Sequence, residues 1–118
     1  MDELNGSHVF GNAKCRLVPP VALPMNWRGR VSELVGLYTD EAHRCSGDAS
    51  QLLHNVCRLA DDADVMLILS VENDSPALCS FYTRFGFLPI QAKPLLMARM
   101  VGAAPLARSA VNKALDLH

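Results

Sequence analysis

The sequence predicts an α/β domain in which helices pack on a parallel or mixed sheet, and three segments in the middle of the chain predict it. Val31–Thr39 is apolar and ends in aromatic and β-branched residues, which is typical of a strand. The apolar side chains from Ala49 to Ala60 follow helical spacing, which predicts an amphipathic helix of about three turns. Val65–Val71 is an unbroken apolar run, the pattern of a central strand covered on both faces. Strand, helix and strand in this order favour parallel pairing.

The composition limits the classes of protein to which the chain can belong. Its 118 residues fit one domain, and 50% hydrophobic with 19% charged residues is a globular composition. A formal net charge of -1 gives no general attraction to nucleic acid or to an acidic membrane. The first residues have no basic start followed by an apolar run, so we expect no secretory signal and a cytoplasmic location.

The first thirty residues predict an irregular segment. Three prolines at positions 19, 20 and 24 break any helix and hinder a central strand. Lys14–Leu17 and Val21–Met25 are candidates for short edge strands, and Trp27–Arg30 is a candidate loop or turn.

Further elements follow the central strand. Ser75-Pro76 predicts a helix start, with a hydroxyl N-cap and proline at the first helical position, and Gly86 predicts its end. Phe87–Gln91 and Leu95–Val101 are two further predicted strands, and Pro105–Leu117 is a predicted last helix. We therefore expect one domain over residues 1–118, with an irregular part (1–30), a core (31–101) and a C-terminal helix (103–118).

The loop from Arg44 to Ala49 lies between a predicted strand and a predicted helix, a place that favours an anion. The first amides of a helix lack internal partners, and the helix dipole adds partial positive charge. Gly47 allows close approach of the backbone, and Arg44 adds a fixed charge, so a pyrophosphate would fit here. An ordinary turn between a strand and a helix remains the alternative for this motif alone.

A second motif follows the buried strand and includes Phe81-Tyr82 and Gly86-Phe87. Together the two motifs resemble those of the GNAT superfamily of N-acetyltransferases, which have an R/Q-x-x-G-x-G/A turn and an N…A…(F/Y)Y-x-x-x-G-F helix. The matching positions here are Arg44, Gly47 and Ala49 in the first motif, and Asn73, Ala77, Phe81, Tyr82, Gly86 and Phe87 in the second. The resemblance covers roughly 31–101 and implies a GNAT-like mixed sheet with flanking helices.

The resemblance also implies acetyl-CoA as cosubstrate and a set of residues that bind it. The end of the preceding strand would pair with the pantetheine arm, the turn would hold the pyrophosphate, and one asparagine would contact CoA where two strands part. These residues are Leu37, Tyr38 and Thr39 for the arm, Arg44, Cys45, Ser46, Gly47, Asp48 and Ala49 for the pyrophosphate, and Asn73 for the last contact.

The residues expected to catalyse the reaction come from the same resemblance. Tyr82 would lie near the thioester sulfur and protonate or hydrogen-bond the departing thiolate, although it could also be an amphipathic core residue. Glu33 lies on the strand where the family often has a general base, and Asp40, Glu41 and His43 lie past its end. Solvated charges at a strand end and water-mediated deprotonation are the alternatives. Asp48, in place of the family's usual apolar residue, is unfavourable beside a pyrophosphate unless its side chain points away.

The predicted function is therefore N-acetylation of an amine by direct transfer from acetyl-CoA. The amine belongs to a small molecule or to a protein lysine, with no nucleic-acid or membrane partner, and an exposed C-terminal helix would favour a homodimer. Two alternatives remain, a catalytically silent GNAT-like module and an unrelated nucleotide-phosphate binder. We expect no metal, because the four cysteines have no CxxC spacing and read as reduced thiols in a cytosolic protein.

Overall fold

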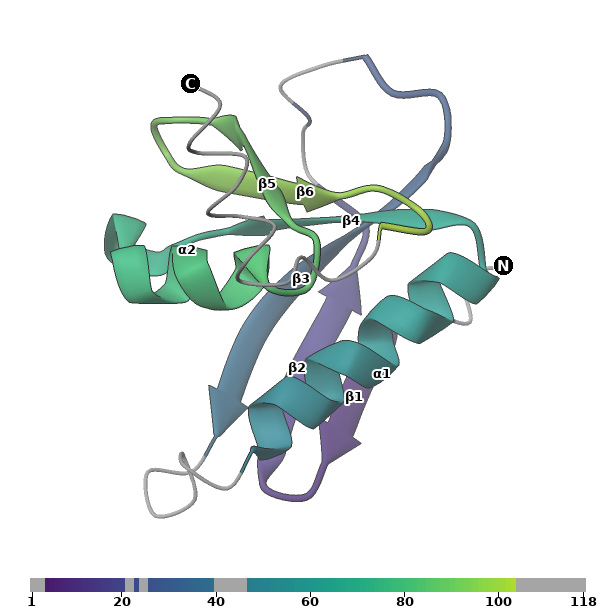
Figure 1. The fold of residues 1–118 in the computed structure, drawn as a ribbon. Helices are drawn as coiled ribbons and strands as arrows, with labels where there is room; N and C mark the ends of the chain where they lie inside the picture. The colour runs from purple at the N-terminus through teal and green to yellow at the C-terminus, as the bar shows by residue number, and fades with distance from the viewer. Residues whose placement is uncertain (1–3, 21–22, 24–25, 40–46, 104–118) are drawn as a thin grey trace.

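The computed structural model describes residues 4–20, 23, 26–39 and 47–103. One six-stranded sheet runs through this part of the chain, with its strands in the order β1-β2-β3-β4-β6-β5 (Figure 1). The strands are β1 (Gly6–Phe10), β2 (Ala13–Val18), β3 (Arg30–Thr39), β4 (Val65–Ser70), β5 (Leu88–Gln91) and β6 (Leu96–Arg99). The helices are α1 (Asp48–Asp62), the single turn η2 (Glu72–Asp74) and α2 (Pro76–Thr83). β3 and β4 are parallel, and the other pairings of these strands are antiparallel, so the predicted mixed sheet is confirmed.

β4 lies inside the sheet and is buried on both faces, as its unbroken apolar run predicts. Alternate residues point to opposite faces of a strand, so β4 contributes to two hydrophobic clusters. The cluster under α1 and α2 receives Val65, Leu67 and Leu69, and the cluster on the other face receives Met66 and Ile68. Both helices therefore cover the same face of β4.

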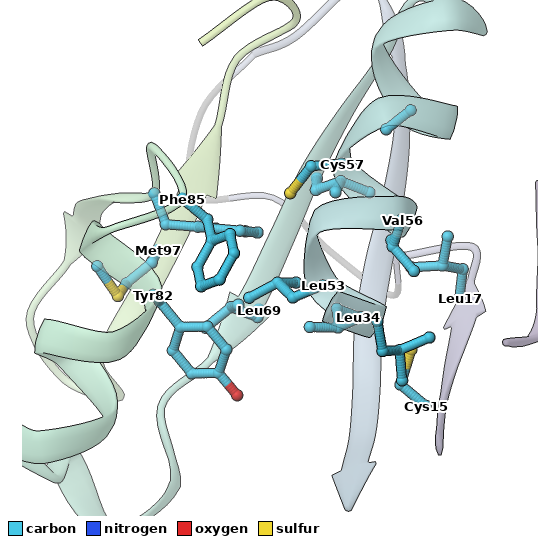
Figure 2. Packing of buried hydrophobic residues seen from close by; sticks show 14 of the residues in the cluster. Cys15, Leu17, Leu34, Leu53, Val56, Cys57, Leu69, Tyr82, Phe85 and Met97 are labelled. Atoms are coloured by element: carbon cyan, nitrogen blue, oxygen red, sulfur yellow. The ribbon is translucent and has the colours of Figure 1, made fainter. Parts of the chain in front are cut away.

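α1 packs on the sheet through one apolar stripe. Leu53, Val56, Cys57 and Ala60 have the spacing i, i+3, i+4, i+7 and are all buried (Figure 2). Leu59, predicted on the same side, is 46% exposed. It follows Leu53 by six residues, which in a helix with 3.6 residues per turn places it outside the stripe.

α2 begins and ends where the sequence predicts. The Ser75 hydroxyl accepts a hydrogen bond from the Leu78 N–H at 3.3 Å, and Pro76 occupies the first turn. After the helix, Gly86 has a φ of 96°, and its N–H donates to the Thr83 carbonyl at 3.0 Å. This left-handed glycine turns the chain from α2 into β5.

The N-terminal segment is more regular than predicted. β1 and β2 form an antiparallel hairpin, and β2, predicted as an edge strand, lies between β1 and β3. β1 was not predicted because its residues are exposed or half-buried throughout and show no apolar alternation. The second candidate strand lies mostly outside the described residues, and Leu23 within it is not in a strand.

The predicted strands after α2 are present as β5 and β6, and β6 ends two residues earlier than predicted, at Arg99. The helix predicted for 103–118 lies outside the described residues, apart from Ala103. Across the described ranges, no helix has the length and apolar character needed to cross a membrane.

Candidate functional site

A cleft opens where β3 and β4 part. Their parallel ladder ends at the pair of Glu33 and Ile68, although β3 continues to Thr39. β4 instead keeps its pairing with β6 up to Ser70. The cleft between the two strand ends has a volume of about 340 Å³. Crevices at the carboxyl ends of parallel strands are the usual ligand sites of open α/β sheets.

Two walls of different origin form this cleft. β3 contributes the five residues from Glu33 to Leu37. The end of β4, η2 and α2 contribute the opposite wall, which consists of Leu69, Ser70, Glu72, Leu78 and Tyr82. The structure thus brings together Glu33, Leu37 and Tyr82, three site residues that the sequence predicted separately.

A bulge shapes the β3 wall. Lys14 pairs with Tyr38 and Arg16 pairs with Val35, so two steps on β2 face three steps on β3. Gly36 lies within the longer stretch at a φ of 63°, a left-handed conformation that suits glycine. A side chain built there would meet no atom within 4 Å, so the cleft is open at the bulge.

Tyr82 is held rigidly by aromatic neighbours. Its ring makes edge contacts with Phe81 and Phe87 at centroid distances of 5.4 and 5.8 Å, and it is 7% exposed. Figure 2 shows its hydroxyl turned away from Phe85 and Met97. Throughout the described part of the chain no protein group hydrogen-bonds this hydroxyl. A buried hydroxyl without a protein partner on a cleft wall can donate to a bound ligand.

The surroundings of Tyr82 keep its phenol protonated. Burial raises its pKa above the usual value, and the nearby Cys15 and Glu72 raise the pKa further. The group is therefore a hydrogen-bond donor at neutral pH and not a phenolate.

Glu72 and Ser70 are cleft residues that the sequence did not single out. Both lie on the wall opposite Glu33, and Glu72 follows β4 by two residues. Their proximity to Glu33 depends on the parallel pairing of β3 with β4, which local sequence pattern does not specify. The signal that could have found them is their position just past the carboxyl end of the central strand.

The predicted pyrophosphate turn is described only from Gly47 onward. Gly47 is the N-cap of α1 at a φ of 86°, and its carbonyl accepts the N–H of Gln51 at 3.0 Å. The Asp48 carboxylate accepts the Asn12 N–H at 2.8 Å, so its Oδ2 is held by the turn between β1 and β2. Ala49 lies in the first turn of α1. Arg44, Cys45 and Ser46 lie outside the described residues.

The other predicted cofactor contacts do not line the cleft with their side chains. Asn73 is exposed in η2, and Ser75 rather than Asn73 caps α2. Tyr38 is 48% exposed, with the Lys14 ammonium 5.7 Å from its ring centroid, and Thr39 is buried. A contact of Tyr38 or Thr39 with a cofactor would therefore come from the backbone of β3.

The backbone of Gly47 makes a specific prediction about stability. We expect Gly47→Val to lower the free energy of unfolding by about 2 kcal/mol, because the left-handed conformation is costly for residues with a Cβ and worst for β-branched ones. Gly47→Asn is the matched control and should lose clearly less, since asparagine tolerates this conformation. Urea denaturation without ligand measures both, and equal losses for the two variants would contradict the prediction.

Neither the cysteines nor the other possible ligands form a metal site in the described ranges. No group of three or more His, Cys, Asp or Glu side chains that could hold an ion occurs there. Cys15, Cys57 and Cys79 are free thiols. Burial raises the pKa of Cys15 and of Cys57 to about 11, so both stay protonated and unreactive at neutral pH.

Comparison with known families agrees with this geometry. The chain matches the model of the acetyltransferase (GNAT) family over residues 3–87, which is most of its length. The chain belongs to the GNAT acetyltransferase family. This membership sets aside the interpretation as an unrelated nucleotide-phosphate binder. No curated protein matches the chain.

Solved GNAT structures share the fold of this GNAT chain at low identity. The GNAT acetyltransferase of Staphylococcus aureus Mu50 is 15% identical with a TM-score of 0.59, over 76% of this chain and 60% of that one. The PaiA N-acetyltransferase of Thermoplasma acidophilum, solved with coenzyme A, is 16% identical with a TM-score of 0.56, over 75% and 52%. A GNAT acetyltransferase of Elizabethkingia anophelis with acetyl-CoA bound is 17% identical with a TM-score of 0.55, over 75% and 67%. The chain thus spans between 52% and 67% of these proteins.

Proposed function

We propose that this chain binds acetyl-CoA in the cleft between β3 and β4 and transfers the acetyl group directly to an amine. The observation that carries the proposal concerns Tyr82. This buried residue lines the cleft, and its hydroxyl forms no hydrogen bond with any described residue. A buried donor without a protein partner suits a ligand atom on which negative charge develops.

The side of β3 that faces the cleft and the start of α1 support this binding mode for the cofactor. Beyond Glu33, the side of β3 that faces the cleft has no partner strand among the described residues, so the backbone of Leu37 and Tyr38 can pair there with the pantetheine amides. The pyrophosphate would lie at the amino end of α1, where Gly47 permits close approach. The hydrogen bond from Asn12 to Asp48 supports this placement, because it holds one carboxylate oxygen at the hairpin.

In the proposed reaction the amine nitrogen attacks the thioester carbonyl carbon. The new C–N bond forms, the C–S bond breaks, and its electron pair goes to the CoA sulfur. The proton of the amine goes to Glu33 or to water. Tyr82 donates a hydrogen bond to the departing sulfur, and full proton transfer is not needed. The raised pKa of the phenol lies above the ordinary thiol value of about 8.5, so the thiolate is the weaker base.

Direct transfer is favoured over a covalent acyl intermediate on Cys15 or Cys57. The thiolate is the reactive form of cysteine, and burial raises the pKa of Cys15 and of Cys57 to about 11. Cys15 is also buried at 2% exposure, which leaves little room for an acyl group.

Acetyl-CoA should stabilise the folded protein. At a free concentration of a hundred times its dissociation constant, a ligand that binds only the native state adds about 2.7 kcal/mol to the free energy of unfolding. We expect a rise of several degrees in Tm with acetyl-CoA or CoA, measured by a thermal-shift assay. ATP, which shares the adenosine and phosphates, and dephosphorylated pantetheine are the controls. The absence of a shift with both CoA forms would contradict cofactor binding.

A catalytically silent module that binds CoA is the second candidate. The described residues before β3 form two strands and no helix, whereas helices in that part of GNAT enzymes often shape the acceptor site. Tight CoA binding without acetylation of any amine would support this candidate. The homodimer and the cytoplasmic location stay predictions.

A further inference from the structure

We propose that Glu72 binds a second positive charge on the acceptor, so that the preferred acceptors are diamines and related dicationic amines. This inference rests on the function proposed above and specifies the class of acceptor. It follows from the two carboxylates in the cleft and from the lack of a basic residue among the described residues that line it.

Glu33 and Glu72 come from opposite walls of the same cleft. Glu33 is the last residue of the β3–β4 ladder, and Glu72 lies in η2 just after β4, with Ser70 on the same wall. None of the ten residues that line the cleft is basic. Neither carboxylate has a hydrogen bond or an ion pair with a protein group of the described chain. Among the described residues, the two carboxylates of the cleft therefore have no bound counter-charge, in a protein whose formal net charge is only -1.

Tyr82 also indicates that a ligand binds in this cleft. It is 7% exposed, lines the cleft and has no hydrogen-bond partner in the described part of the chain, so its hydroxyl can donate to a bound ligand. The charge of Glu72 acts on Tyr82 and contributes to its raised pKa. A cation bound by Glu72 would offset this charge and make the phenol a better donor to the departing sulfur.

Two carboxylates suit an acceptor with two amino groups because the reaction treats the two groups differently. The reacting nitrogen must lose its proton before attack, which requires one base or a water. The second nitrogen stays an ammonium ion throughout and gains a charge-assisted hydrogen bond if a carboxylate faces it. A monoamine makes only the contact at its reacting nitrogen, so Glu72 should favour diamines over monoamines.

The test compares 1,4-diaminobutane with 1-aminobutane, which lacks only the second ammonium group. Calorimetric titration into protein saturated with CoA measures binding without a need for turnover. We expect the diamine to bind at least about tenfold more tightly, as one hydrogen bond to a charged group predicts. Glu72→Gln should remove most of this preference. Asp74→Asn is the matched control, because Asp74 is an exposed carboxylate of the same short helix that does not line the cleft.

The possible outcomes separate this inference from the proposed function. Equal binding of the two amines, a preference that survives Glu72→Gln, or an equal loss in Asp74→Asn would overturn the inference while CoA binding stands. If CoA does not bind at all, the proposed function fails first. The same titrations on the CoA-free protein then decide whether Glu72 still selects the diamine.

Discussion

Tyr82→Phe is expected to lower kcat by roughly a hundredfold, the effect of removing one preorganised donor from a developing negative charge. The hydroxyl serves the departing thiolate in the transition state and makes no hydrogen bond with the described protein in the ground state. The ring keeps its contacts with Phe81 and Phe87, so packing is preserved. Release of the CoA thiol during acetylation of an amine panel measures the rate.

Two controls accompany this measurement. The Tm of Tyr82→Phe should stay close to that of the wild type, because no protein hydrogen bond is lost within the described chain and the buried ring remains. Its affinity for acetyl-CoA should also be retained, since a role confined to the transition state changes kcat and not ground-state binding. Turnover at the wild-type rate would refute the assigned role and leave Tyr82 as a core residue.

Asp61→Ala is expected to lower the free energy of unfolding by about 3 kcal/mol, because it leaves a buried guanidinium without its counter-ion. Arg99 lies at the end of β6 with a side chain that is 5% exposed, and it contacts Asp61 at 2.7 and 3.1 Å. Its Nε–H also donates to the Phe85 carbonyl at 2.7 Å, and the Asp61 carboxylate accepts the Gly102 N–H at 2.8 Å. This network ties the end of α1 to β6 and to the turn after α2.

Asp62→Ala is the matched control for this prediction. Asp62 is the exposed last residue of α1, and a change there should stay within about 0.5 kcal/mol. Urea denaturation of the three proteins supplies the comparison. If Asp61→Ala loses no more unfolding free energy than Asp62→Ala, the pair of Arg99 and Asp61 contributes little to stability.

The pH dependence gives a second measurement of the same pair. The hydrogen bond from Arg99 lowers the pKa of Asp61, despite the opposing effect of burial. A carboxylate whose pKa is lowered on folding stabilises the protein at pH values above its unfolded pKa of about 3.9. This stabilisation is lost as the pH falls through the pKa of the folded state. The difference in the free energy of unfolding between wild type and Asp61→Ala should therefore be largest at neutral pH and shrink below about pH 4.

The local sequence pattern was sufficient to predict the elements whose own residues show a clear apolar pattern or a clear helix cap. The stripe of α1 apart from Leu59, the apolar run of β4 and the cap at Ser75 each depend on residues close in sequence, and each was predicted correctly. β1 was missed because its stability comes from pairing with β2 and not from its own exposed residues. Leu59 was wrongly assigned to the buried side of α1, although helical spacing from Leu53 places it outside the stripe.

The two motifs and their spacing were enough to predict the fold, the family and the candidate residues Tyr82, Gly47 and Glu33. The arrangement of the cleft needed the tertiary structure, because it arises from the pairing of β3 with β4 and its end at Glu33. That pairing brings Glu72 opposite Glu33 and places the Tyr82 hydroxyl on the wall between β4 and α2. The pairing of β3 with β4 joins residues such as Glu33 and Ile68, which are far apart in sequence, through backbone hydrogen bonds, which carry no side-chain signal in the sequence. The acidic character of the cleft is therefore visible only once the chain has folded.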